Sequence, residues 1–200
     1  MEILLASVLG YLLGSIPNAL VIGKVFFNTD IREHGSGNLG GTNAGRTLGA
    51  KAGVAVAILD VLKATIAMVI TYFIFPQATI YAGFFATLGH CFPIFAKFKG
   101  GKAVSTAMGF LLGISILVTK RPILHFIVPV LIFFGVLYLS KMVSLSAIVS
   151  IIASVVILAV SQDNLHVTLA FAIIAAIVVY RHRTNIQRIK EKTERKITWM

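Results

Sequence analysis

The chain has 200 residues, of which 58% are hydrophobic and 12% are charged. Soluble domains carry about 25% charged residues, so this composition excludes an ordinary soluble protein and indicates an integral membrane protein. A formal net charge of +11 could indicate nucleic-acid binding, but membrane topology explains most of it. The single cysteine, Cys91, excludes an intramolecular disulfide.

Seven apolar segments predict seven transmembrane helices, because each approaches or exceeds the roughly 18 residues that indicate a membrane span. They lie at about residues 3–22, 52–75, 78–95, 103–118, 123–139, 143–160 and 165–180. The first segment lacks the basic start and the cleavage site of a signal peptide, so we expect a retained helix. In it, Gly10 and Gly14 form a pair of small residues that favours close helix packing. The expected fold is one all-α membrane domain over residues 1–200.

The positions of the basic residues predict the orientation of these spans. If the C-terminus is cytoplasmic and there are seven spans, 15 of the 18 Lys and Arg residues lie on the cytoplasmic side. Cytoplasmic segments of membrane proteins carry an excess of Lys and Arg. We therefore expect the N-terminus outside a cytoplasmic (inner) membrane and the polar segments, with any active site, on the cytoplasmic face.

A polar, glycine-rich stretch at residues 34–46 interrupts the apolar sequence. Glycines allow a ligand to approach backbone N–H groups, and short polar side chains between them can donate hydrogen bonds. The residues of this kind are Ser36, Gly37, Asn38, Gly40, Gly41, Thr42 and Asn43, with Arg46 at the end. The stretch is typical of a phosphate site, although a flexible linker is the alternative. Its G-x-G-x-x-G pattern does not predict dinucleotide binding, because no strand precedes it.

Asp60 and Lys63 stand three residues apart inside the second apolar segment, so they lie on one helix face and can pair. Charges inside a span usually face a partner or a cavity. The pair is either structural or a means of orienting Lys63 toward a phosphate. The two roles are compatible.

His90 lies near the end of the third segment, where it could act as a general base or as an interfacial residue. No carboxylate that would orient it is evident in the sequence. Cys91 is interpreted as a packing residue. Lys102 follows two glycines at the start of the fourth segment, which favours an anion site or contact with anionic lipid headgroups. It is not part of a Walker A motif, because Ala103 follows the lysine.

Further candidates lie in the second half of the chain. Ser144 opens the sixth segment, where a helix cap is the alternative role. His182 and Asn185 follow the seventh segment among basic residues, which could instead be only a stop-transfer flank. The histidines have no recognised metal spacing, so we expect neither a metal nor a cofactor.

Two motifs carry a resemblance to a known family. Residues 35–46 and 89–102 resemble the bacterial acyl phosphate:glycerol-3-phosphate acyltransferase (PlsY) family, and the likeness extends over the whole chain. The resemblance implies transfer of a fatty acyl group from acyl phosphate to the 1-hydroxyl of glycerol 3-phosphate. The products would be lysophosphatidic acid and phosphate, early in phospholipid synthesis. The implied partners are these two small molecules and membrane lipid, without nucleic acid or an obligate protein partner.

The resemblance also leads to a hypothesis about the site. Ser36, Asn38, Thr42, Asn43 and the loop amides would hold acyl phosphate, and Arg46, Lys102, His182 and Asn185 would hold glycerol 3-phosphate, with Lys63 between them. Gly37, Gly40, Gly41 and Ser144 complete the expected binding residues, and His90, Ser36, Asn38 and Lys102 are the expected catalytic ones. The two phosphate assignments could be exchanged.

The proton of the attacking hydroxyl could pass to His90 or to the phosphate of the donor, which we slightly favour. The alternative function is a transporter of a phosphorylated metabolite, although the odd number of spans and the lack of a visible inverted repeat count against it.

Overall fold

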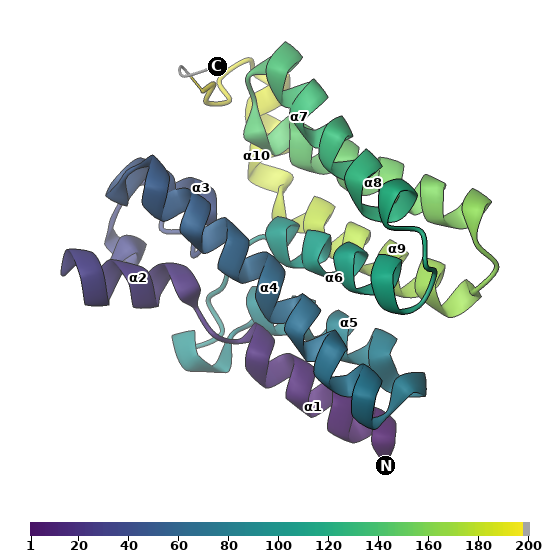
Figure 1. The fold of residues 1–200 in the computed structure, drawn as a ribbon. Helices are drawn as coiled ribbons and strands as arrows, with labels where there is room; N and C mark the ends of the chain where they lie inside the picture. The colour runs from purple at the N-terminus through teal and green to yellow at the C-terminus, as the bar shows by residue number, and fades with distance from the viewer. Residues whose placement is uncertain (198–200) are drawn as a thin grey trace. The chain divides into compact units, whose positions relative to one another are not determined.

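The computed structural model describes residues 1–197, and these residues form helices and connecting loops without a strand (Figure 1). The all-α prediction is therefore confirmed. The chain divides into two compact units, Met1–Gly113 and a second unit from Ile114 onward.

Apart from the short α3 in the glycine-rich stretch, the first unit contains four complete α-helices. A further helix begins in the first unit and ends in the second. These helices are α1 (Glu2–Gly14), α2 (Asn18–Phe27), α4 (Ala50–Ile74), α5 (Thr79–Cys91) and α6 (Val104–Leu117). The short elements between them are η1 (Ile31–Glu33), α3 (Gly41–Leu48), η2 (Pro76–Ala78) and η3 (Ile94–Ala96).

After the end of α6, the second unit continues with a π-helical turn, η4 (Ile123–Ile127), which leads into α7 (Val128–Ser140). The helices α8 (Val143–Ser161), α9 (Leu165–Arg181) and α10 (Arg183–Lys190) follow. Helix α8 packs against both α7 and α9, and the Ser150 hydroxyl of α8 donates to the Pro129 carbonyl of α7 over 2.6 Å. The chain bends by 57° between α9 and α10.

The first apolar segment differs from the expected continuous helix. Helix α1 ends at Gly14 and α2 begins at Asn18. Proline has no N–H to continue the hydrogen-bond ladder, and its ring crowds the preceding turn, so Pro17 interrupts the helix. The break allows the Ile16 carbonyl to accept a hydrogen bond from a side chain, Lys63 of α4.

The expectation of seven spans is met only in part. Among residues 1–197, five helical segments are long and apolar enough to cross a membrane, counting Glu2–Phe27 as one, and a sixth is added if the bent pair α9 and α10 is one span. Helix α6 is apolar, but its 14 residues give a length of about 21 Å, short of a hydrocarbon core of about 30 Å. The chain is thus an all-helical membrane protein with five or six spans of sufficient length.

The glycine pair of α1 provides the close packing that the sequence predicts. A Cβ atom at Gly10 would overlap the backbone of Ala82 in α5, and one at Gly14 would overlap the backbone of Ala86. Small residues allow this direct backbone approach. The pair therefore fixes α1 against the helix that carries His90.

Replacing Gly10 with alanine is expected to lower the free energy of unfolding by about 1–3 kcal/mol, because the added methyl group overpacks the α1–α5 contact. The buried thiol of Cys91 in α5 provides the measurement, since a thiol-reactive dye labels it as the detergent-solubilised protein unfolds on heating. Gly135→Ala is the control, because nothing lies within 4 Å of a Cβ at that position. Equal labelling temperatures for Gly10→Ala and wild type would contradict the packing role.

Candidate active site

The glycine-rich stretch is more ordered than the loop that the sequence predicts. Helix α2 extends to Phe27, Asp30 caps the 3-10 turn η1, and residues 41–48 form helix α3. Asn43 organises the remaining turn, because its amide nitrogen donates to the carbonyls of Ile31 (3.0 Å) and His34 (3.2 Å). Asn43 is buried and therefore contributes its amide to the loop itself.

Ser36 is tied to the same asparagine. Its backbone N–H and its hydroxyl donate to Asn43 Oδ1 at 2.8 and 3.2 Å. The side chain of Ser36 is nevertheless exposed, as are those of Thr42 and Arg46 on α3, whereas Asn38 is half-buried. The sequence-predicted donors thus lie in one ordered turn and on the helix α3 that follows it, with Asn43 beneath the turn and Ser36 at its surface.

The glycines of this stretch have different roles. Gly41 packs against Gly53 of α4, since a Cβ at position 41 would lie 2.8 Å from the Gly53 carbonyl oxygen. This close approach accounts for Gly41 without a ligand. Gly40 precedes α3 as its N-cap residue, and Gly37 lies in the preceding turn.

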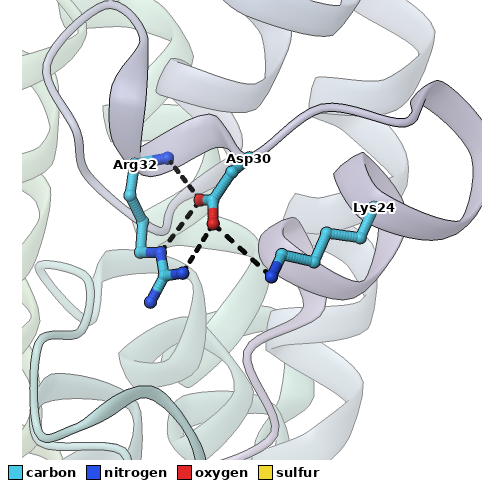
Figure 2. Close-up of polar contacts among 3 residues, drawn as sticks. All are labelled: Lys24, Asp30 and Arg32. Atoms are coloured by element: carbon cyan, nitrogen blue, oxygen red, sulfur yellow. Dashed lines mark hydrogen bonds and ion pairs between the residues drawn. The ribbon is translucent and has the colours of Figure 1, made fainter.

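An ion-paired aspartate, Asp30, caps the turn η1 that directly precedes the glycine-rich stretch (Figure 2). Asp30 Oδ1 accepts hydrogen bonds from the Arg32 backbone N–H (3.1 Å) and Nε (2.9 Å), and Oδ2 lies 2.5 Å from Arg32 Nη2 and 3.5 Å from Lys24 Nζ. The hydrogen bonds from Arg32 hold the pKa of the Asp30 carboxyl well below its usual range. Sequence reasoning had not singled out this residue.

Replacing Asp30 with alanine is expected to lower the free energy of unfolding by about 1 kcal/mol, because a helix-cap acceptor is lost. Asp30→Asn should have a smaller effect, since the amide oxygen keeps the cap and only ion pairs at the surface are lost. Because the folded-state pKa is lowered, the charge contribution is present above the pKa of the unfolded state and disappears as the pH falls through the folded-state pKa. Thermal unfolding of both variants measures the difference, and equal stability of Asp30→Ala and wild type would contradict the capping role.

Four polar side chains meet in the interior of the first unit. Asp60 Oδ1 accepts from Lys63 Nζ at 2.9 Å and from Asn18 Nδ2 at 3.0 Å. Lys63 Nζ also lies 3.0 Å from His90 Nδ1 and donates to the Ile16 carbonyl at 3.0 Å. Asp60, Lys63 and His90 are each buried. The predicted pairing of Asp60 with Lys63 is confirmed, and Asn18 and His90 join it.

The sequence showed no carboxylate that could orient His90, but the structure places one beside its ring. Asp60 Oδ1 lies 3.6 Å from His90 Nδ1. Helices α4 and α5 pack against each other, which brings together two residues that are thirty positions apart. This proximity had no signal in the sequence, although Asn18, a polar residue directly after Pro17 in an apolar segment, could have been identified as a partner.

The segment after α5 folds back onto His90. The N–H groups of Gly101 and Gly100 donate to the carbonyls of His90 (3.1 Å) and Cys91 (3.2 Å). A Cβ at Gly101 would lie 2.0 Å from His90 Nε2, so only glycine allows the backbone to lie against this edge of the imidazole. The half-buried Lys102 follows directly. The first unit therefore places a lysine, a histidine and a glycine–glycine–lysine segment beside one another.

The candidates of the second unit meet at a carboxylate that sequence reasoning missed. Glu194 Oε1 accepts from Ser144 Oγ at 2.8 Å and from Asn185 Nδ2 at 2.6 Å, and Oε2 accepts from Arg188 Nε at 2.7 Å. The Glu194 side chain is only 5% exposed. The tail reaches this position because the Ile197 N–H donates to the Lys141 carbonyl (2.8 Å).

Burial raises the pKa of Glu194, but the hydrogen bonds from Arg188, Asn185 and Ser144 outweigh it, and the pKa lies below its usual value. His182 is also buried, and its Nδ1 lies 2.8 Å from the Val178 carbonyl one turn earlier in α9. Ser144 and Asn185 are thus brought together, while His182 contacts the end of α9.

Comparisons with known proteins show the family of the chain. Residues 4–192 match the family model described as glycerol-3-phosphate acyltransferase. The chain belongs to the glycerol-3-phosphate acyltransferase family.

Relatives and solved structures extend over nearly the whole chain. A glycerol-3-phosphate acyltransferase of Bacillus subtilis (strain 168) is 48% identical, with 100% of both chains covered, and one of Geobacillus kaustophilus (strain HTA426) is 46% identical, with 98% of this chain and 96% of the relative covered. The crystal structure of PlsY, an integral membrane glycerol 3-phosphate acyltransferase, in its glycerol 3-phosphate form is 35% identical with a TM-score of 0.90. The match covers 99% of this chain and 96% of that structure.

Proposed function

We propose that this protein transfers a fatty acyl group from acyl phosphate to the 1-hydroxyl of glycerol 3-phosphate, as an early step of phospholipid synthesis. The observation that carries the proposal is the match over 99% of the chain to a membrane acyltransferase solved in its glycerol 3-phosphate form. The ordered glycine-rich turn and the cationic side chains that follow it suit substrates that both carry phosphate.

The reaction needs no covalent intermediate on the protein, because acyl phosphate is already activated. The 1-hydroxyl oxygen attacks the acyl carbonyl carbon, an ester C–O bond forms, and the C–O bond to phosphate breaks. The hydroxyl proton passes to an oxygen of the departing phosphate, which leaves as inorganic phosphate. Donors placed for the developing oxyanion lower the barrier, and loop amides or Asn38 are the candidates.

The site residues follow the same proposal. Ser36, Asn38, Thr42 and the loop amides bind one phosphate, and the Asn43 amide supports them from below. In the first unit, Arg46 and Lys102 bind the other phosphate, and Lys63 supplies positive charge near His90. In the second unit, His182 and Asn185 are expected to bind glycerol 3-phosphate, and Ser144 is a further expected substrate-binding residue. His90 positions the substrates.

The proposal includes the orientation of the chain in the cytoplasmic membrane. Seven spans, with α6 as a short fourth span, place the N-terminus outside and the C-terminus inside. The excess of Lys and Arg in residues 24–51, in the residues before α6 and in the tail supports this orientation. The active site then faces the cytoplasm.

Purified protein, reconstituted in vesicles, tests the function directly. We expect release of inorganic phosphate from palmitoyl phosphate that depends strictly on glycerol 3-phosphate, with formation of one equivalent of lysophosphatidic acid. Palmitoyl-coenzyme A in place of palmitoyl phosphate is the control for the donor and should give no product. Uptake of glycerol 3-phosphate into the vesicles without acyl transfer would support the transporter instead.

A further inference from the structure

We propose that Asp60 is a positioning residue for His90: it anchors the Lys63 ammonium, which in turn fixes the imidazole as the tautomer protonated at Nε2. The Lys63 ammonium lies 2.9 Å from Asp60 Oδ1 and 3.0 Å from His90 Nδ1. The role in catalysis rests on the proposed acyl transfer, whereas the assignment of the tautomer does not.

The hydrogen-bond inventory of Lys63 determines which nitrogen of His90 carries the proton. An ammonium has three N–H donors and no acceptor, so a ring nitrogen at 3.0 Å from it must accept. His90 Nδ1 is therefore unprotonated, and the neutral imidazole carries its hydrogen on Nε2. The reverse arrangement, with a neutral Lys63 amine accepting from Nδ1, would leave the buried Asp60 carboxylate without its cation, which is strongly unfavourable.

All three N–H donors of the Lys63 ammonium have a hydrogen-bond acceptor in the first unit. One points to Asp60, one to His90 and one to the Ile16 carbonyl, 3.0 Å away, which the break at Pro17 makes accessible. Asn18 adds a second donor to Asp60 Oδ1 at 3.0 Å. The Pro17 break thus supplies both an acceptor for Lys63 and a donor for Asp60, so the ammonium has little freedom to move away from His90.

The consequence concerns proton transfer. While Lys63 occupies Nδ1 and the hydrogen resides on Nε2, His90 has no ring nitrogen free to take up the hydroxyl proton. The protonated Nε2 lies against Gly101, at the segment that leads to Lys102. His90 therefore acts as a neutral N–H donor at this segment, which agrees with transfer of the hydroxyl proton to the donor phosphate.

Nitrogen-15 NMR of histidine-labelled protein in detergent micelles tests the tautomer, because unprotonated and protonated ring nitrogens resonate far apart. The His90 signals are identified by their loss in His90→Gln. We expect wild-type His90 to show an unprotonated Nδ1 and a protonated Nε2 at mildly alkaline pH. A wild-type His90 that is protonated at Nδ1 would overturn the proposal.

The variants Asp60→Asn and Asp60→Asn/Lys63→Met test whether Asp60 controls the His90 tautomer through Lys63. The double variant removes both charges, so that neither is left buried without its partner. In both, we expect a mixture of His90 tautomers and a turnover number lowered at least about tenfold, with little change in KM. Thr71→Val is the matched control on α4, because its buried hydroxyl has no hydrogen-bond partner within residues 1–197. It should retain the wild-type tautomer and turnover.

The outcomes separate this proposal from the function on which it rests. A fall in turnover with an unchanged His90 tautomer would mean that Asp60 is only structural, and the proposal would fail. If wild-type protein has no acyl transfer activity but its tautomer still responds to both variants, the proposed function fails and the tautomer assignment holds.

Discussion

Replacing Glu194 with alanine is expected to lower the free energy of unfolding by about 1.5–3 kcal/mol and to abolish acyl transfer. Its buried carboxylate receives hydrogen bonds from Ser144, Asn185 and Arg188. Without it, Arg188 loses its ion pair, and the two expected substrate-binding side chains lose the acceptor that holds them together. Hydrogen bonds to charged groups contribute about 1.5–3 kcal/mol, and the ion pair itself adds little because the Arg188 side chain is 44% exposed.

Thermal unfolding followed by circular dichroism, together with phosphate release, measures both effects. Glu191→Ala is the matched control, because Glu191 is exposed and its carboxylate accepts from Gln187 Nε2 of the same surface helix (2.9 Å). Its stability should stay within about 0.5 kcal/mol of wild type. If Glu194→Ala and Glu191→Ala unfold at the same temperature, the buried carboxylate has no role in stability.

The same carboxylate predicts a dependence of stability on pH. The pKa of Glu194 is lower in the folded state than in the unfolded state. Its contribution is therefore present above the unfolded-state pKa and is lost as the pH falls through the folded-state pKa. Glu194→Gln should flatten the acidic side of the stability profile, and an unchanged profile would assign the acid sensitivity to other groups.

Replacing Gly101 with alanine is expected to lower kcat/KM at least about a hundredfold, equivalent to about 2.7 kcal/mol of transition-state stabilisation. The added methyl group would lie 2.0 Å from His90 Nε2, 2.8 Å from Cε1 and 3.0 Å from Cδ2. The imidazole cannot retreat easily, because Lys63 holds Nδ1 at 3.0 Å and the Gly101 N–H is bonded to the His90 carbonyl. Either the ring or the segment before Lys102 must move.

Steady-state kinetics with palmitoyl phosphate and glycerol 3-phosphate measure this effect, with Gly135→Ala as the control because a Cβ there meets nothing within 4 Å. The unfolding temperature distinguishes a displaced His90 from a failure to fold, since overpacking alone is expected to destabilise by about 1–3 kcal/mol. A Gly101→Ala protein with wild-type kcat/KM would show that the position of His90 does not matter for the reaction.

The sequence by itself determined the features that depend on local periodicity and composition. Apolar segments identified an all-α membrane protein, and the three-residue spacing of Asp60 and Lys63 correctly predicted their pairing. Gly10 and Gly14, one turn apart, predicted a close helix contact. Each of these follows from geometry within one helix, where neighbours in sequence are neighbours in space.

Only the tertiary structure decided which helix faces meet. The packing of α4 on α5 brings Asp60 to His90, the folding back of the tail brings Glu194 to Ser144, and the contact of α3 with α4 explains Gly41 as a packing position. These pairs are separated by 30, 50 and 12 residues, and they depend on the rotation and register of packed helices, for which a single sequence carries no periodic signal. The proline in the sequence explains the helix break at Pro17. Only the packing of α4 beside this break shows that Lys63 donates a hydrogen bond to the Ile16 carbonyl there.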